Sequence, residues 1–475
     1  MIQLHVTVED RVRLVELSRL VSVEDVENGV ATVSVLHEQL SLLRSAGFRY
    51  RKIPAPKTTA VQMCSEGWEE QAEPNWDCYP TYYQYDALMQ RLAAEFPDIC
   101  HLEDLGPSAN QMNPHRLLAL KITDHPDFEE VEPEVFLTST MHGDETAGYV
   151  LLLRLAFNLL TSYESDPITT DLVDDTEIWI NPLANPDGTY YGGDSTVGSA
   201  IRFFTTEDGR PTSVDPNRNF PDRFLGRFPF GRPWWPETEA MMAFAANHTI
   251  VLSANLHGGA ELVNYPWDSD CERHPDDAWF RDLSLAWAQS AQENGPTGYL
   301  DDCKPPRCSN APCIPGVTNG ADWYQINGGR QDYMTFFRGG REVTVELSSE
   351  KLLSTSRLEE LWQANRRAVL DFIGAAQIGI HGTVTDFSGR PLSATVVLLN
   401  HDTSQSRSWV RTDPDAGDFH RLTLPGVYDV AISAAGRKTI VLDNIIVSVE
   451  NPSTLVEVQL PIMPDSGSQG DFSVW

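Results

Sequence analysis

The sequence predicts an α/β domain flanked by an N-terminal β-α-β-β-α-β open sandwich and a C-terminal all-β sandwich. Three observations predict this order. Strand-like and helix-like stretches alternate at the start of the chain, buried strands alternate with long helices in the middle, and short strands without any helical period fill the end. With 475 residues the chain is also too long for one ordinary hydrophobic core.

The N-terminal open sandwich is predicted over residues 1–55. A turn-forming ENG sequence joins its second strand to its third. In chain order the expected strands and helices are IQLHVTV, DRVRLVELSRL, VSVEDV, VATVSV, LHEQLSLLRSAG and FRYRKI. The stretch PAPKTTA, which begins at Pro54, and the acidic stretch SEGWEEQAEPNWD predict a linker, which we place at residues 56–75.

The α/β domain is predicted over residues 76–376. Its strands are apolar on both faces, which indicates a sheet covered by helices. The strand-like runs include EVFLTSTM, TEIWINPLAN, HTIVLSANL and REVTVELSS, and the helical runs include YDALMQRLAAEF and RLEELWQANRRAVLDFIGAA. Polar residues cluster directly after the strands, where open α/β sheets usually place their sites.

The all-β sandwich is predicted over residues 377–462, and residues 463–475 are predicted to be a loose tail. Short alternating runs separated by turns predict the strands, among them GIHGTVTD, ATVVLLN, GVYDVAISA and STLVEVQLP. No set of residues in this region suggests chemistry. We therefore expect it to act as a scaffold or to contact a partner.

The net charge of the chain limits the kinds of partner that it can bind. There are 68 Asp and Glu against 35 Lys and Arg, a formal charge of −33, which repels nucleic acid and anionic membrane surfaces. The same field would attract cationic peptides, although an acidic surface also serves solubility or a salty environment. The longest apolar run, residues 150–160, is interrupted by Arg154 and Asn158 and is too short to cross a membrane.

The chain has seven cysteines, of which Cys303, Cys308 and Cys313 lie in one loop. Their spacing is not that of a C-x-x-C zinc knuckle, so we expect disulfides, with one thiol left over, in a secreted or periplasmic protein. Met1 is followed by IQLHVTVEDR, which has neither a basic region nor an apolar core typical of a signal peptide. Either a signal was removed from this chain or it is not exported by that route.

A candidate metal site begins in TSTMHGDE, residues 138–145, where a strand ends and a helix follows. His142 and Glu145 are three residues apart and face one side of the turn. A catalytic zinc needs a third protein ligand, and His257 lies at another strand end beside two glycines. Two alternatives remain at this point: an H-x-x-E pair is expected by chance about once in such a chain, and His257 alone would suit an ordinary loop histidine.

These residues belong to a series of motifs that resembles the zinc metallocarboxypeptidases, most closely the subgroup of carboxypeptidases N, E, D and M. In chain order the further motifs are NPDG at 185–188, NRNFPD at 217–222, HGG at 257–259, NYPWD at 264–268, GVTNGADWYQINGGRQDY at 316–333 and VELSSEK at 345–351. The resemblance covers residues 76–376. It implies a mixed-sheet catalytic domain followed by the transthyretin-like β-sandwich of that subgroup.

The resemblance also implies roles for individual residues. His142, Glu145 and His257 would hold one Zn²⁺ per chain, and Asp215 would accept the other ring N–H of His142. Glu346 matches the general base, which takes a proton from the zinc-bound water as that nucleophile attacks the amide and can then protonate the departing amine.

Recognition of a chain end is implied by a second group of residues. Arg218 offers a planar fork to the terminal carboxylate, Asn217 adds one hydrogen bond, and Tyr324 matches the mobile tyrosine that closes over this carboxylate. A packed aromatic is the alternative for Tyr324. Arg202 matches the arginine that stabilises the oxyanion, with Arg210 as a rival because the connection to NRNF is longer than usual.

The preferred terminal residue is implied by Asp268 and Gln331, which match the pocket of the subgroup that removes C-terminal Arg or Lys. An acid at the pocket floor favours a cation through a charge-assisted bond. The alternative is that Asp268 caps a turn and the pocket admits other residues. Asp144 stands where the subgroup usually has Asn, which should matter little beside a dication.

The sequence thus predicts a zinc-dependent metallocarboxypeptidase acting on the C-termini of peptides or proteins. The alternatives are a catalytically silent module that binds peptide ends, or a carboxypeptidase of apolar or acidic specificity. An H-E-x-x-H endopeptidase is excluded, since HEQLS at 37–41 lacks the second histidine. Residues 1–55 have the element order of digestive carboxypeptidase prosegments, and could shield the site, assist folding or remain as an accessory module.

Overall fold

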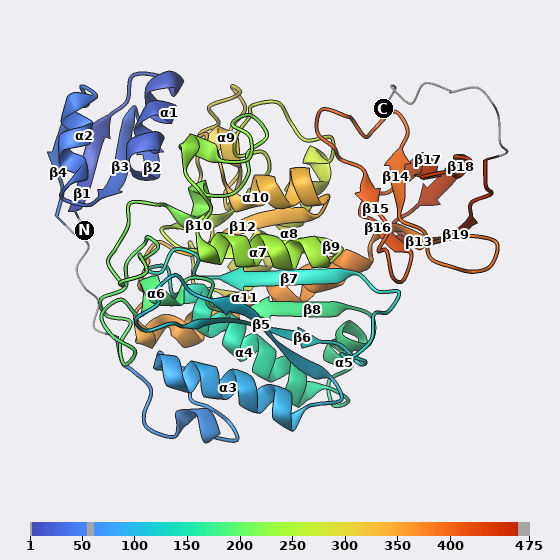
Figure 1. Cartoon of the computed structure of the whole chain (residues 1–475), viewed down its shortest axis with the longest axis horizontal. Helices are drawn as coiled ribbons and strands as arrows, with labels where there is room; N and C mark the ends of the chain where they lie inside the picture. The colour runs from blue at the N-terminus through green and yellow to red at the C-terminus, as the bar shows by residue number, and fades with distance from the viewer. Residues whose placement is uncertain (1, 55–60, 464–475) are drawn as a thin grey trace.

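The computed structural model describes residues 2–54 and 61–463 (Figure 1). An eight-stranded sheet forms the centre, a four-stranded sheet lies at the N-terminal end, and sheets of three and four strands form the C-terminal end. The terminal parts each have a core cluster separate from the central one. The predicted fold class, an α/β centre between a small open sandwich and an all-β sandwich, is confirmed.

The N-terminal part has the predicted β-α-β-β-α-β order. Its elements are β1 (Ile2–Thr7), α1 (Arg11–Leu20), β2 (Ser22–Glu27), β3 (Val30–Val35), α2 (Gln39–Ser45) and β4 (Tyr50–Lys52). The sheet order is β2-β3-β1-β4, so β2 is an edge strand. Asn28 and Gly29 join β2 to β3 with φ of 48° and 74°, the left-handed conformation that a tight hairpin turn requires.

The central sheet has the order β11-β10-β12-β9-β7-β8-β6-β5 and is mixed. Its strands are β5 (Cys100–Pro107), β6 (Arg116–Ile122), β7 (Glu134–Ser139), β8 (Glu177–Asn181), β9 (Ile250–His257), β10 (Ala260–Tyr265), β11 (Val317–Asn319) and β12 (Arg341–Ser348). The four strands β12, β9, β7 and β8 run parallel to one another. Their carboxyl ends therefore meet at one edge, where the chain places the chemically capable residues.

Helices cover both faces of this sheet (Figure 1). They are α3 (Tyr82–Glu95), α4 (Ala147–Ser162), α5 (Pro167–Asp174), α6 (Pro186–Thr189), α7 (Pro236–Asn247), α8 (Asp277–Asn294), α9 (Gly320–Trp323), α10 (Arg330–Tyr333) and α11 (Leu358–Gly374). Short 3-10 or π turns lie at Trp68–Glu70, Pro216–Arg218, Pro229–Gly231, Met334–Arg338, Thr355–Arg357 and Ala375–Gln377. Val135 and Leu137 of β7 pack into the cluster containing α4, whereas Phe136 packs into that containing α7.

Part of the stretch that we predicted as a linker packs on the central domain. Trp68 is 1% exposed and belongs to the central core cluster. A disulfide joins Cys64 to Cys78. Two further disulfides join Cys271 to Cys308 and Cys303 to Cys313. Cys100 is a buried free thiol.

The C-terminal part is a two-sheet sandwich around one core cluster. Its strands are β13 (Gly379–Thr385), β14 (Ala394–Leu398), β15 (Val410–Arg411), β16 (Asp418–Arg421), β17 (Gly426–Ala434), β18 (Ile440–Val447) and β19 (Ser453–Gln459). The predicted tail, residues 463–475, lies outside the described residues apart from Met463. Within the described ranges, no helix is long and apolar enough to cross a membrane.

A buried charge cluster joins the sandwich to the central sheet. Asp276 lies before α8, and its Oδ2 atom is 2.7 Å from Nη2 of Arg341, the first residue of β12. The Oδ1 atom is 2.9 Å from Nη2 of Arg421 and 2.6 Å from Nε2 of His401, both in the sandwich. Arg421 also pairs with Asp402 at 2.6 Å. Polar contacts as well as packing therefore hold these two parts together.

Candidate metal centre and peptide-binding cleft

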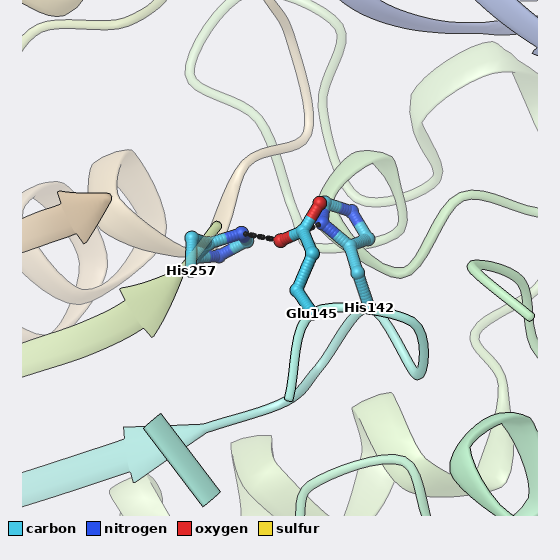
Figure 2. Close-up of side chains that lie close together, drawn as sticks. All are labelled: His142, Glu145 and His257. Carbon is cyan, nitrogen blue, oxygen red and sulfur yellow. Dashed lines mark hydrogen bonds and ion pairs between the residues drawn. The ribbon is translucent and has the colours of Figure 1, made fainter. Parts of the chain in front are cut away.

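His142, Glu145 and His257 converge at the carboxyl edge of the central sheet (Figure 2). His142 and Glu145 come from the turn between β7 and α4, and His257 is the last residue of β9. The Glu145 Oε2 atom is 3.0 Å from His142 Nδ1 and 2.8 Å from His257 Nδ1. All three side chains are buried, and their ligand atoms lie within 4.8 Å of one another.

The donor set of this cluster suits a zinc ion. Two imidazole nitrogens and one carboxylate oxygen are typical of catalytic zinc sites, in which three protein ligands leave a position open. The far ring nitrogens are held as well: His142 Nε2 is 2.9 Å from Asp215 Oδ1, and His257 Nε2 is 2.9 Å from Asn255 Nδ2. The contact between His142 and Asp215 is the one that the sequence predicts, whereas Asn255 was not predicted. It lies two residues before His257 on the same face of β9, and this spacing could have indicated it.

Arg202 lies within this centre and Arg210 does not. The Arg202 Nη1 atom is 2.6 Å from Glu145 Oε1, and Nη2 is 3.4 Å from Asp215 Oδ2. Arg210 is exposed and pairs with Asp208 on the surface. Burial alone would raise the pKa of Asp215, but Arg202 and His142 lower it well below its usual range.

Glu346 lies beside the three candidate metal ligands. It is on β12, in register with His257 of the parallel neighbour β9. Its Oε2 atom is buried and has no hydrogen-bond partner among the described residues. Burial, and then the nearby Glu145 carboxylate, raise the pKa of the Glu346 carboxyl well above its usual range. A carboxyl with a raised pKa and a free oxygen is suited to accept a proton in the cleft.

The residues expected to bind a terminal carboxylate line the same cleft. Asn217 and Arg218 belong to the 3-10 turn that follows Asp215, whose Oδ1 accepts the Asn217 N–H at 2.9 Å. Arg218 Nη2 donates to the Val23 carbonyl at 3.3 Å, and Arg218 Nε is buried without a partner among the described residues. The Tyr324 hydroxyl donates to a carbonyl of the same segment, that of Glu24, at 3.1 Å.

Asp268 and Gln331 are in direct contact. Asp268 is 3% exposed, and its Oδ1 accepts hydrogen bonds from Gln331 Nε2 and from Asn264 Nδ2, both at 3.0 Å. Burial and the Asp332 carboxylate raise the pKa of Asp268 to about 8. A Cβ atom at Gly320 would lie 1.9 Å from Asp268 Oδ1, so only glycine permits this close approach.

A cleft of about 1030 Å³ joins these groups. Its lining includes the three metal-ligand candidates, Glu346, Arg218, Tyr324 and Asp268. Gln3, Glu24, Asp25 and Thr32 of the N-terminal part also line it. The sequence-predicted site residues thus share one cleft with part of the N-terminal domain, apart from Arg210 at the surface and from Gln331 and Asp215, which lie behind the lining.

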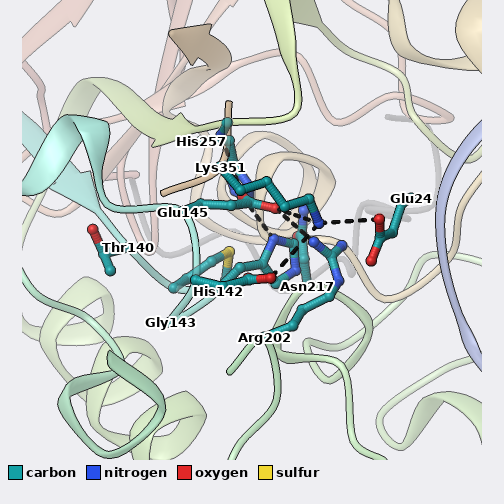
Figure 3. Close-up of polar contacts among 12 residues, drawn as sticks. Glu24, Thr140, His142, Gly143, Glu145, Arg202, Asn217, His257 and Lys351 are labelled. Atoms are coloured by element: carbon teal, nitrogen blue, oxygen red, sulfur yellow. Dashed lines mark hydrogen bonds and ion pairs between the residues drawn. The ribbon is translucent and has the colours of Figure 1, made fainter. Parts of the chain in front are cut away.

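Three residues to which the sequence assigned no role also contact the centre, namely Ser22, Glu24 and Lys351. Figure 3 shows Glu24 and Lys351 beside the candidate metal ligands. Ser22 of β2 contacts Asp215 and accepts a hydrogen bond from Arg202 Nε at 2.7 Å. Lys351 Nζ is 3.2 Å from Glu24 Oε2 and 3.4 Å from Glu145 Oε1. The contacts of Ser22 and Glu24 join segments that are far apart in the chain, so no local pattern could predict them.

Comparisons with known proteins agree with this geometry. Residues 85–368 match the model of the zinc carboxypeptidase family, and residues 379–461 match that of the carboxypeptidase regulatory-like domain. Mouse carboxypeptidase D is 36% identical over 364 residues, which cover 74% of this chain and 25% of that protein. Mouse carboxypeptidase M is 34% identical over 364 residues, 74% of this chain and 77% of that protein.

The fold is also found among solved structures. Carboxypeptidase A from Helicoverpa armigera superposes with a TM-score of 0.58 at 19% identity, covering 79% of this chain and 98% of that one. The chain spans about a quarter of the length of carboxypeptidase D, where the match covers 25%. The resemblance that the motifs indicated is confirmed: this chain belongs to the zinc carboxypeptidase family and carries the regulatory-like domain after its catalytic domain.

Proposed function

We propose that this protein is a zinc-dependent metallocarboxypeptidase that hydrolyses the C-terminal peptide bond of peptides or proteins and prefers C-terminal Arg or Lys. The observation that carries the proposal is the arrangement of His142, Glu145 and His257 beside Glu346, in one cleft with Arg218. The family match and the relatives named carboxypeptidase support it. A zinc ion bound there would polarise the substrate carbonyl and activate a water molecule.

The side chains of the cleft would divide the reaction among them. Arg218 and Asn217 hold the terminal carboxylate of the substrate, and Tyr324 closes over it. Glu346 accepts the proton of the attacking water and returns it to the leaving amine. Arg202 faces the centre with a buried guanidinium and stabilises the negative charge that develops on the carbonyl oxygen.

The preference for a basic residue rests on Asp268. Its carboxyl group is buried in the lining of the cleft, next to Gln331 and Asn264, and lacks a cationic partner within 4.0 Å among the described residues. A lysine or arginine side chain would supply that partner. The relatives named carboxypeptidase D and M support the activity, while the preferred residue stays a proposal.

The N-terminal domain would block this cleft in the intact chain. Ser22 binds Arg202, the Val23 carbonyl binds Arg218, and the Glu24 carbonyl binds Tyr324. A substrate carboxylate needs the same donors, so it has to displace β2 first. We therefore assign residues 1–55 as a shielding prosegment. The three disulfides support a secreted or periplasmic location.

The first test is release of the terminal amino acid from blocked dipeptides that end in Arg, Lys, Phe, Leu or Glu. It compares the intact chain with a chain cut after folding at a protease site engineered between Pro54 and Val61 and freed of its N-terminal domain by gel filtration, each with and without a chelator. Chelator-sensitive release of Arg and Lys, larger after cutting, supports all parts of the proposal.

Other outcomes of the same test separate those parts. Release of Phe or Leu in place of Arg keeps the enzyme and overturns the role of Asp268. Equal release before and after cutting overturns the shielding role of the N-terminal domain. Absence of release from the cut, zinc-loaded chain favours the module that only binds peptide ends.

A further inference from the structure

A group of donors that the proposed reaction does not use lies next to the cleft, and one of them, Trp323, is in its lining. We call Lys304, Arg307 and Trp323 the cationic rim. Lys304 and Arg307 lie in the disulfide-bonded loop before β11, and Trp323 ends α9. Positive side chains at this place are notable in a chain of net charge −33. They give one part of the cleft a sign opposite to that of the molecule.

The cationic rim already holds carboxylates in the intact chain. Asp25 of β2 accepts the Trp323 Nε1–H bond through Oδ1 at 2.7 Å, and its Oδ2 is 3.7 Å from Lys304 Nζ. Glu27 Oε1 is also 3.7 Å from Lys304 Nζ. Arg307 Nη2 donates to the Val26 carbonyl. These contacts with the acidic strand β2 thus indicate that the cationic rim binds carboxylates.

The central domain itself fixes the position of the cationic rim. The bridges Cys303–Cys313 and Cys271–Cys308 hold the loop, and the Arg307 N–H donates to the Asp322 carbonyl at 3.0 Å. The Lys304 ammonium lies 5.1 Å from the centroid of the Trp323 ring. Among the described residues, Asp25 and Glu27 carry the only carboxylates within 4.0 Å of Lys304 Nζ. Removal of the N-terminal domain would leave this cation without an acidic partner.

We propose that the cationic rim binds an acidic side chain of the substrate, so that the preferred substrates carry Asp or Glu a few residues before a basic C-terminus. This inference rests on the proposed function. Ser22 contacts Arg202 at the metal centre, and Asp25 is three residues farther along the same extended strand. Three residues of strand span about 10 Å, so the cationic rim lies within reach of a short peptide bound in the cleft.

The test uses the full chain, cut after folding at the site between Pro54 and Val61 and freed of its N-terminal domain by gel filtration. The substrates are blocked hexapeptides that end in Arg and carry Glu, Gln or Lys at one position, moved along the peptide. At one position the Glu peptide should have a kcat/KM about threefold to tenfold above that of the Gln peptide, and the Lys peptide should lie below both. The preference should shrink at high ionic strength.

Charge reversal gives a result that misfolding cannot produce. The double variant Lys304→Glu and Arg307→Glu should reverse the order, so that the Lys peptide is cleaved fastest. Arg366→Glu, an exposed position on α11, makes half of that charge change away from the rim and should leave the Glu to Gln ratio unchanged. Equal rates for Glu and Gln peptides at every position would overturn the inference while leaving the proposed function intact.

Binding provides a readout that does not depend on hydrolysis. Fluorescence anisotropy of labelled Glu and Gln peptides is measured with the zinc-loaded cut chain carrying Glu346→Gln. Tighter binding of the Glu peptide, lost in the double variant, supports the inference even if no peptide is cleaved. Equal affinities for both peptides would overturn it.

Discussion

Glu346 is the residue on which the proposed chemistry depends most. Glu346→Gln keeps the shape of the side chain but removes the proton acceptor, so kcat should fall by about 10³-fold. The zinc content should stay near one ion per chain, because Glu346 is not among the candidate ligands. His257→Ala is the contrasting variant and should lose both activity and zinc. Activity and metal are measured on the same cut samples, and full activity of Glu346→Gln would refute the assignment.

Asp268 should make the substrate preference depend on pH. Its pKa is raised to about 8, so the carboxylate forms as the pH rises through that value and its charge is lost below it. The ratio of kcat/KM for an Arg peptide to that for a Leu peptide should therefore increase as the pH rises through about 8 and level off above that value. The titration of Glu346 changes the rate for both peptides by the same factor, so it cancels in the ratio. Asp268→Asn should give a low ratio without pH dependence, whereas an unchanged profile would contradict the role of Asp268.

Single residues were predictable where they lie in a motif. They were not predictable where their role comes from contacts with a segment that is distant in the sequence. His142, Glu145 and His257 lie at strand ends in recognisable sequences, and the structure brings them together. The choice between Arg202 and Arg210 stayed open in the sequence because it depends on how a long loop folds. Ser22 had no local signal, since its importance comes from contacts with Arg202 and Asp215 across the cleft.

At the scale of elements, the proposed shielding of the cleft rests on the edge strand β2, which contacts Arg202, Arg218 and Tyr324. Glu24 of β2 pairs with Lys351, so Glu24→Lys places two cations together and should weaken the contact of β2 with the cleft. The intact variant should hydrolyse an Arg peptide several-fold faster than the intact wild type. Once both chains are cut and freed of the N-terminal domain, their rates should be equal. Glu38→Lys, an exposed change in the same domain, serves as the control and should leave the intact chain as slow as the wild type.

The elements themselves were predictable to different degrees. Strands with strong alternation or continuous apolar runs, such as β3 and β7, appear where the pattern placed them. The pairing order of the central sheet could not be predicted, because β12 inserts between β9 and β10 through contacts between segments distant in sequence. The burial of Trp68 beside the Cys64–Cys78 bridge could not be predicted either, because the surrounding segment of the sequence is polar and acidic.

For the whole molecule, Asp276 is the main polar connection between the central sheet and the sandwich. Asp276→Asn removes a buried negative charge that pairs with Arg341 and Arg421, and should destabilise the chain by about 3 kcal/mol or more. The measurement is the thermal unfolding midpoint, followed by circular dichroism. Asp282→Asn on the exposed side of α8 is the matched control and should change the midpoint little. Equal midpoints for both variants would show that packing alone holds the sandwich.

The way in which the three parts pack against one another was less predictable from the sequence than the fold of each part. Hydrophobic periodicity identifies an open sandwich, an α/β domain and a β-sandwich, because each buries its own core. Their mutual placement depends on a few polar contacts, such as Glu24 with Lys351 and Asp276 with Arg421, which hydrophobic periodicity does not reveal.

In the proposed shielding, the chain connection between β4 and Val61 keeps the N-terminal domain next to the cleft that its residues help to line. While that connection is intact, the domain is present at a fixed, high effective concentration, and the degree of blocking does not depend on how much protein is in solution. Cutting it turns the same contact into an equilibrium between two molecules. The cut protein should then be silent in a concentrated compartment and active once diluted, so that dilution itself completes the activation that proteolysis begins.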